Sequence, residues 1–153
     1  MADDAIFMMG KFPAHLPGDL LYASNHMWCR PEAGPPYPFG FTTYAVRLMQ
    51  DVYFLDWVIS AGDQVQHLQQ IGHIETSKAV SDLFSPIAGT LSAFNADLLS
   101  DPSGINVEPY GGGWLFTMSG DISTLMTAQQ YCDFLQANWE KTQRLIKGKM
   151  NLE

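Results

Sequence analysis

The chain has 153 residues, of which 46% are apolar and 16% are charged. These values are typical of one folded domain, and a domain of this length buries roughly 68–70% of its unfolded surface. The formal net charge is −8, with only eight lysines and arginines in total. Nucleic acid is excluded as a partner because phosphate binding needs clustered cations. The expected partners are neutral or basic proteins.

No stretch approaches the ~20 apolar residues of a membrane span, so no membrane partner is expected. The two cysteines, Cys29 and Cys132, form neither a disulfide framework nor a metal-ligand spacing, which fits a reducing compartment. The sequence therefore predicts a monomeric protein of the cytoplasm.

Prolines interrupt residues 1–19, and regular apolar repeats are few there. This predicts an N-terminal extension that docks loosely on the body. Alternatively, its Met8, Met9 and Phe12 cover an apolar groove. Residues 20–120 are then expected to form the main β domain.

Apolar and polar residues alternate well enough over residues 20–30 to predict one strand. Residues 31–40 hold four prolines and two glycines, which predict a rigid loop and argue against a helix or a central strand. Residues 41–50 have the spacing of a short helical turn capped by Thr42 or Thr43.

Residues 51–59 are rich in β-branched and aromatic side chains and predict a strand that ends in a turn at residues 61–63. A further strand is expected over residues 90–95, followed by a connecting loop over residues 98–106.

The tail, residues 121–150, predicts a helical segment packed on the same domain. Thr127 and Gln130 have the spacing of a capping box, and an aromatic stripe that includes Tyr131 and Phe134 needs burial. We expect this helix to pack on the sheet rather than to bind a partner.

One lysine stands out between two short apolar runs. Residues 71–89 read Ile-Gly-His-Ile-Glu-Thr-Ser-Lys-Ala-Val-Ser-Asp-Leu-Phe-Ser-Pro-Ile-Ala-Gly, and Lys78 is the only lysine between Lys11 and Lys141. The pattern predicts a hairpin with Lys78 at its turn, next to small residues that leave it open to a modifying enzyme. Most turn lysines are plain surface charges, and that alternative remains.

Residues 75–89 resemble the lipoylation hairpin of glycine-cleavage H proteins, Glu-Ser-Val-Lys-Ala-Val-Ser-Asp-Leu-Tyr-Ser-Pro-Val-Ser-Gly. The run Pro-Tyr-Gly-Gly-Gly-Trp over residues 109–114 is similar to the family's Pro-Tyr-Gly-Glu-Gly-Trp and lies at the family's spacing from the hairpin. Upstream, His26 and Trp28 match the family's His-Glu-Trp. The resemblance covers residues 20–135.

This resemblance implies a mainly β, α+β fold. The expected architecture is a barrel-sandwich hybrid of two small β-sheets with the lipoyl lysine on a hairpin turn and a C-terminal helix. It also implies lipoate as the cofactor, bound through an amide to Lys78 by a lipoate ligase or lipoyl transferase. The protein would be a carrier subunit of a multi-enzyme system and not itself an enzyme. A biotin carrier is the rival, but its lysine lies between two methionines, whereas Ser77 and Ala79 flank Lys78.

The resemblance carries site residues over as well. By resemblance, Glu75 is part of what lipoylating enzymes recognise, Ala79 belongs to the matched motif beside the lysine, and Asp82 fits a nearby turn. Both carboxylates could equally be solvated charges. His26 matches a residue near the lipoyl arm, with a hydrogen-bonded strand histidine as the alternative.

Two departures from the family bear on the cargo of the arm. Met27 stands where the family has the carboxylate that helps hold an ammonium group, and an enclosed charged amine without a partner costs several kcal/mol. Cys29 stands where the family has an apolar residue. A thioether and a thiol suit sulfur chemistry, although a free cysteine is commonly just a small buried residue.

The chain therefore looks most like the divergent lipoate-binding proteins of the sulfur-oxidising heterodisulfide-reductase-like system. Its arm would shuttle intermediates and electrons to a partner oxidoreductase of that kind. One alternative is a glycine-cleavage H protein that carries the aminomethyl group between glycine decarboxylase and aminomethyltransferase. Another is an unmodified H-like interaction module.

Overall fold

The computed structural model describes the backbone of residues 3–150 and the side chains of residues 3–144. The strands are β1 (Ala5–Met9), β2 (Phe12–Leu16), β3 (Leu21–Tyr22), β4 (Met27–Cys29), β5 (Tyr37–Phe41), β6 (Val52–Trp57), β7 (Gln64–Val65), β8 (Gln70–Thr76), β9 (Val80–Phe84), β10 (Gly89–Phe94) and β11 (Phe116–Gly120). The helices are η1 (Pro31–Ala33), α1 (Thr43–Met49), α2 (Ala96–Ser100), α3 (Gly104–Val107) and α4 (Ala128–Met150).

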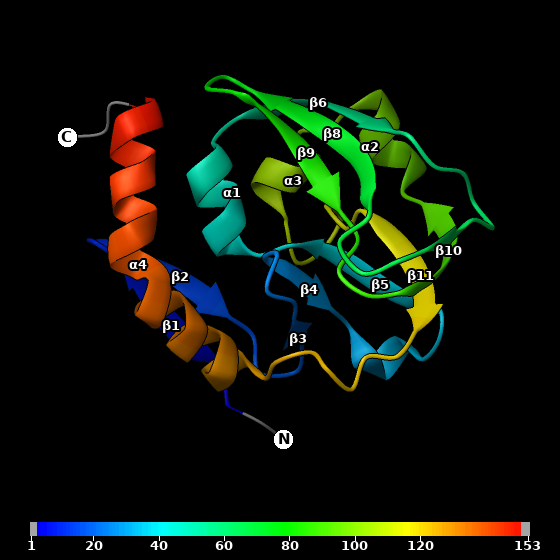
Figure 1. The fold of residues 1–153 in the computed structure, drawn as a ribbon, viewed down its shortest axis with the longest axis horizontal. Helices are drawn as coiled ribbons and strands as arrows, with labels where there is room; N and C mark the ends of the chain where they lie inside the picture. Colours follow the sequence, from blue (N-terminus) through cyan, green and yellow to red (C-terminus); the bar gives the residue numbers. More distant parts are fainter. Residues whose placement is uncertain (1–2, 151–153) are drawn as a thin grey trace.

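Two sheets enclose the main core. A six-stranded sheet has the order β3-β4-β5-β11-β10-β7, and a three-stranded sheet has the order β6-β8-β9 and lies above it in Figure 1. Apolar side chains from both sheets meet between them, among them Phe39, Ile74, Leu91 and Phe116, each fully buried. This arrangement confirms the predicted mainly β barrel-sandwich.

Two glycines of the predicted hairpin lie where backbones approach closely. A Cβ atom on Gly72 would overlap the carbonyl oxygen of Asp56, and one on Gly89 would overlap the carbonyl oxygen of Ser119. Any larger residue would push the paired strands apart. Both positions therefore require glycine.

The predicted short helix is confirmed as α1. Its N-cap is Thr42, whose hydroxyl oxygen accepts a hydrogen bond from the backbone N–H of Ala45 at 3.2 Å. This bond satisfies one of the four N–H groups that a helix start leaves unpaired. α1 lies between the N-terminal hairpin and the three-stranded sheet (Figure 1).

A second apolar layer joins the two ends of the described chain. β1 and β2 form an antiparallel hairpin, and α4 packs on β1. Phe7 meets Trp139 of α4 edge-on, with ring centroids 5.4 Å apart. The capping box is confirmed because the Thr127 N–H donates to Gln130 Oε1 and the Gln130 N–H donates to Thr127 Oγ1.

The prediction of a loosely docked N-terminal extension is wrong for the residues described. Ala5, Phe7 and Met9 alternate with exposed residues along β1 and are buried in the second layer. An alternation of period two is the strand signal that the prolines in this segment obscured. Of the three residues proposed to cover a groove, Met9 and Phe12 pack in this layer and Met8 is exposed.

Two expectations for residues 20–40 are also corrected. Residues 20–30 form two strands, β3 and β4, because the chain turns through His26, whose φ is 72°. The rigid loop predicted over residues 31–40 is wrong for its second half, where β5 lies between β4 and β11. The carbonyl of Pro38 in this strand still accepts a hydrogen bond from the Arg30 N–H. Proline removes only the donor of a ladder pair.

The expected loop over residues 98–106 contains parts of α2 and α3 instead. Asn95 starts α2, since its side chain accepts a hydrogen bond from the Asp97 N–H. The C-terminal helix starts at Ala128 rather than near residue 121, because Met126 pairs with Tyr22 as an isolated β-bridge. Within residues 3–150, no helix combines the length and hydrophobicity needed to cross a bilayer.

Candidate functional site

Lys78 lies at the tip of the β8–β9 hairpin, as predicted. Thr76 and Ala79 close the turn through a backbone hydrogen bond of 2.9 Å from the Thr76 N–H to the Ala79 carbonyl. The Thr76 hydroxyl oxygen also accepts the backbone N–H groups of Lys78, at 3.1 Å, and Ala79, at 3.2 Å. One side chain therefore fixes the backbone on both sides of the Lys78 side chain.

The turn leaves the lysine accessible. Ser77, Lys78 and Ala79 are all exposed, whereas Thr76 is 6% exposed and anchors the turn from below. Among the described residues, no carboxylate lies within 4 Å of the Lys78 ammonium group. An amine in this position is free to react with an enzyme that approaches the hairpin tip.

The two predicted carboxylates lie beside the tip on neighbouring strands. Glu75 stands between Phe54 and Val80 in the strand register, one row below the turn. Asp82 stands opposite His73, and its Oδ1 accepts a hydrogen bond from the Gln70 side chain at 3.1 Å.

A pocket of about 190 Å³ opens beside the edge strand β9. We call it the hairpin pocket; its walls are the turn before β4, α1, and strands β8 and β9. Its lining includes Asn25, His26, Met27 and Asp82. The structure thus brings three of the predicted site residues together, and apolar side chains supply most of the remaining lining: Phe41, Ala45, Leu48, Met49, Ile74 and Leu83.

Asn25, which lines this pocket, has an unused hydrogen-bond acceptor. Its side-chain N–H donates to the Phe84 carbonyl at 2.9 Å, which fixes the orientation of the amide. Its Oδ1 is buried and has no hydrogen-bond partner among the described residues. Buried acceptors are usually paired, so this oxygen needs a donor that the described residues do not supply.

His26 is held neutral in the wall of the pocket. Burial lowers the pKa of His26 from 6.5 to about 4. Its Nδ1 lies 2.9 Å from the hydroxyl oxygen of Tyr131, which comes from α4. Because His26 contacts a helix far away in the sequence, its environment depends on the tertiary fold.

Met27 and Cys29 lie on the same strand in different surroundings. Met27 is 1% exposed, belongs to the main core and lines the hairpin pocket. Cys29 is fully buried and is not part of the pocket lining, and burial raises the pKa of its thiol to about 12. The buried, unreactive alternative for Cys29 is therefore the one that this position favours.

Two residues of the site were missed in the sequence. Thr76 was passed over although threonine often bonds the backbone two or three residues on in turns. Asn25 had no signal of its own, because nothing local indicates that its Oδ1 would be buried without a donor. The Phe84 carbonyl, which accepts the side-chain N–H of Asn25, comes from a segment far away in the chain.

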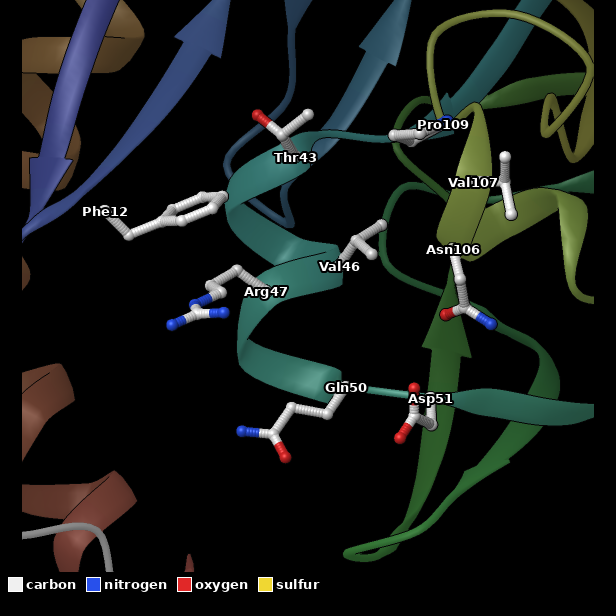
Figure 2. Close-up of a pocket in the computed structure, with 9 residues that line it drawn as sticks. All are labelled: Phe12, Thr43, Val46, Arg47, Gln50, Asp51, Asn106, Val107 and Pro109. Carbon is white, nitrogen blue, oxygen red and sulfur yellow. The ribbon is translucent and has the colours of Figure 1, made fainter.

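Figure 2 shows a larger pocket on the opposite face of α1. It has a volume of about 570 Å³, and none of the predicted site residues lines it. The Arg47 guanidinium lies 4.5 Å from the centroid of the Phe12 ring at one side. Asn106, at the other side, uses both of its side-chain polar groups to bond the backbone of Val52.

The fold and the site together define a class of protein. A rigid barrel-sandwich presents one accessible lysine on a fixed turn, beside a small and mostly apolar pocket. Such an arrangement suits a carrier that holds a covalently attached group and presents it to other proteins.

Comparison with known proteins identifies the family. The family model described as glycine cleavage H-protein matches residues 20–138. Glycine cleavage system H proteins from Aeromonas hydrophila and Corynebacterium aurimucosum are 36% and 37% identical to this chain. Each alignment covers 77% of the chain and 94% of the relative. The crystal structure of a glycine cleavage system H protein from Mycobacterium marinum superimposes with a TM-score of 0.70 and 31% identity, covering 79% of this chain and 99% of that one.

The chain belongs to the glycine cleavage H-protein family. Members of this family are noncatalytic carriers of lipoate, which is covalently attached to a lysine. The chain is accordingly a lipoyl carrier protein. The N-terminal hairpin and the end of α4 lie outside the family match.

Proposed function

We propose that Lys78 is the lysine that carries lipoate and that the hairpin pocket receives the resulting arm. The accessible tip, the turn fixed by Thr76 and the apolar lining next to it all fit such a group. When bound there, lipoate supplies a disulfide that accepts a group or electrons at one enzyme and delivers them at another. The partners would be a lipoate ligase and the enzymes that load and unload the arm.

Intact-mass measurement tests the attachment. Protein incubated with lipoate, ATP and a lipoate ligase should gain the mass of one lipoyl amide, and peptide mapping should place it on Lys78. Lys78→Arg should abolish the gain, whereas Lys141→Arg, which changes an exposed lysine of α4, should retain it. A biotin-sized gain, or a modified Lys141, would contradict the proposal.

We further propose that the cargo is the aminomethyl group of glycine cleavage, passed between glycine decarboxylase and aminomethyltransferase. One observation carries this choice: Asn25, which lines the hairpin pocket, has an Oδ1 without a hydrogen-bond partner among the described residues. An ammonium group is a donor with three N–H bonds, and it binds best where acceptors converge. The Asp82 carboxylate, which also lines the pocket, favours a positive charge there.

Sulfur oxidation with a heterodisulfide-reductase-like partner is the second candidate. Met27 supports it, because a buried thioether replaces the carboxylate of the family motif in the wall of the pocket. An uncharged sulfur adduct would suit this apolar lining better than an amine would. Cys29 adds no support, since it lies in the core away from the pocket.

Two parallel incubations separate the candidates. Lipoylated protein is treated with glycine and glycine decarboxylase, or with a sulfane sulfur donor, and the Lys78 peptide is weighed. The first candidate predicts efficient aminomethyl loading. It also predicts that Asn25→Ala shortens the lifetime of the loaded protein on the order of tenfold, the worth of one charge-assisted hydrogen bond. Ser24→Ala, an exposed neighbour, is the matched control. Poor loading together with a stable sulfur adduct would favour the second candidate.

A further inference from the structure

Three polar side chains form a buried row beside the hairpin pocket. Thr42 Oγ1 lies 3.1 Å from the Tyr131 hydroxyl oxygen, and this oxygen lies 2.9 Å from His26 Nδ1. Thr42 and Tyr131 are both fully buried, so water does not compete for their protons. Each hydroxyl group in the row must therefore find its acceptor within the protein.

The hydrogen bonds of Thr42 decide which group in the row donates its proton to which neighbour. Among the described residues, its hydroxyl has two partners: the backbone N–H of Ala45, from which it accepts, and the Tyr131 hydroxyl. The Thr42 proton is consequently donated to the Tyr131 oxygen, because no other acceptor is in reach. The Tyr131 proton is then left for His26 Nδ1.

The opposite direction leaves a buried proton unpaired. If His26 Nδ1 carried a proton, it would donate to Tyr131, and Tyr131 would donate to Thr42. The Thr42 oxygen would then accept twice and its own proton would have no partner. Burying an unpaired hydroxyl proton is unfavourable, so the row strongly prefers the first direction.

We propose that Tyr131 is a positioning residue that fixes His26 as the neutral tautomer with its proton on Nε2. With Nδ1 occupied by Tyr131, a ligand that reaches the imidazole meets an uncharged N–H donor. The hairpin pocket, which His26 lines, would thus offer the docked arm a donor at this residue. The use of this donor rests on the proposed carrier function, whereas the tautomer does not.

The packing around the row supports a fixed geometry. The Tyr131 ring stacks on Tyr22 with centroids 4.8 Å apart and planes within 3°. The His26 backbone is tied at both ends, since its N–H donates to Ala23 and its carbonyl accepts from the Thr42 N–H. The lowered pKa of His26 keeps the ring neutral at pH 7, as the tautomer requires.

Nitrogen NMR of histidine-labelled protein tests the tautomer directly. In the unmodified protein at pH 7, the His26 Nδ1 resonance should lie in the unprotonated, pyridine-like region and Nε2 in the protonated, pyrrole-like region; His26→Asn assigns the signals. Tyr131→Phe keeps the ring but removes the hydroxyl, and should shift both resonances towards the average of the two tautomers. Tyr44→Phe is the control, because the Tyr44 ring lies 5.0 Å from His26 without a hydrogen bond to it among the described contacts.

Two results would overturn the proposal. A protonated Nδ1 in the wild-type protein is decisive even if Tyr131→Phe does not fold, and an unchanged tautomer in folded Tyr131→Phe is equally decisive. Lipoylation at Lys78 should also shift the Nε2–H resonance in the wild type and much less in Tyr131→Phe. If the tautomer is as proposed but lipoylation leaves the Nε2–H resonance unchanged, the donor role is overturned. The mass test of Lys78 still decides the carrier function separately.

Discussion

The Thr76 hydroxyl oxygen accepts the backbone N–H of Lys78 at 3.1 Å. The same oxygen accepts the N–H of Ala79, and Thr76 itself is 6% exposed at the end of β8. A lysine that carries lipoate, as proposed for Lys78, must be exposed, yet its backbone must keep one shape for the enzyme that recognises it. Here a buried side chain provides that shape from beneath the turn.

Thr76→Val should loosen the hairpin tip. The substitution keeps the size and β-branching of the side chain but leaves two N–H groups without their acceptor, at a cost of about 1 kcal/mol in the free energy of unfolding. The rate of lipoylation at Lys78 should fall several-fold more than this stability loss explains. Urea unfolding and timed intact-mass measurements check the two effects. Thr76→Ser, which retains the hydroxyl, should stay close to wild type, and equal behaviour of both variants would refute the role of Thr76.

Cys29 should not react with thiol reagents in the folded protein. It is fully buried in the main core, and burial raises the pKa of its thiol to about 12. The thiolate, which is the reactive form, is therefore scarce at neutral pH. A chromogenic disulfide reagent should modify Cys29 only when the protein unfolds. Rapid labelling under native conditions, mapped to Cys29, would return this residue to the candidates for sulfur chemistry.

His26 should make the protein less stable in acid. Its pKa of about 4 lies below the ordinary 6.5, so between these values the unfolded chain binds a proton that the folded protein does not. The free energy of unfolding should therefore fall as the pH drops from about 6.5 to about 4, by up to about 3 kcal/mol, and this contribution is absent above about pH 7. Urea unfolding across this range should give a shallower pH dependence for His26→Asn, since asparagine tolerates the φ of 72°. Identical pH profiles would contradict the assignment.

Phe7 should matter far more than its neighbour Ile6. Phe7 is 5% exposed and meets the rings of Tyr44 and Trp139, whereas Ile6 is 59% exposed on the same strand. Phe7→Ala should lower the free energy of unfolding by about 3 kcal/mol, and Ile6→Ala by no more than about 0.5 kcal/mol. Similar effects of the two substitutions in thermal unfolding would mean that the N-terminal hairpin is not packed as described.

The hairpin that carries Lys78 could be predicted from the sequence because its signals are local. The turn and the strands on either side each follow from a few adjacent residues. The N-caps at Thr42 and Thr127 were predictable for the same reason, since a cap needs only its own first turn.

The pocket could not be predicted in this way, because its walls come from segments far apart in the chain. The side-chain N–H of Asn25 finds its acceptor on Phe84, 59 residues later, and its Oδ1 is buried without a partner among the described residues. His26 becomes neutral through burial in the folded chain, and its Nδ1 gains a hydrogen-bond partner only when Tyr131, 105 residues later, packs against it. Hydrogen-bond satisfaction and desolvation depend on which groups the folded chain brings together. The sequence by itself determined the family and the barrel-sandwich and singled out Lys78 as the proposed attachment site, whereas the tertiary structure decided which side chains lie beside it.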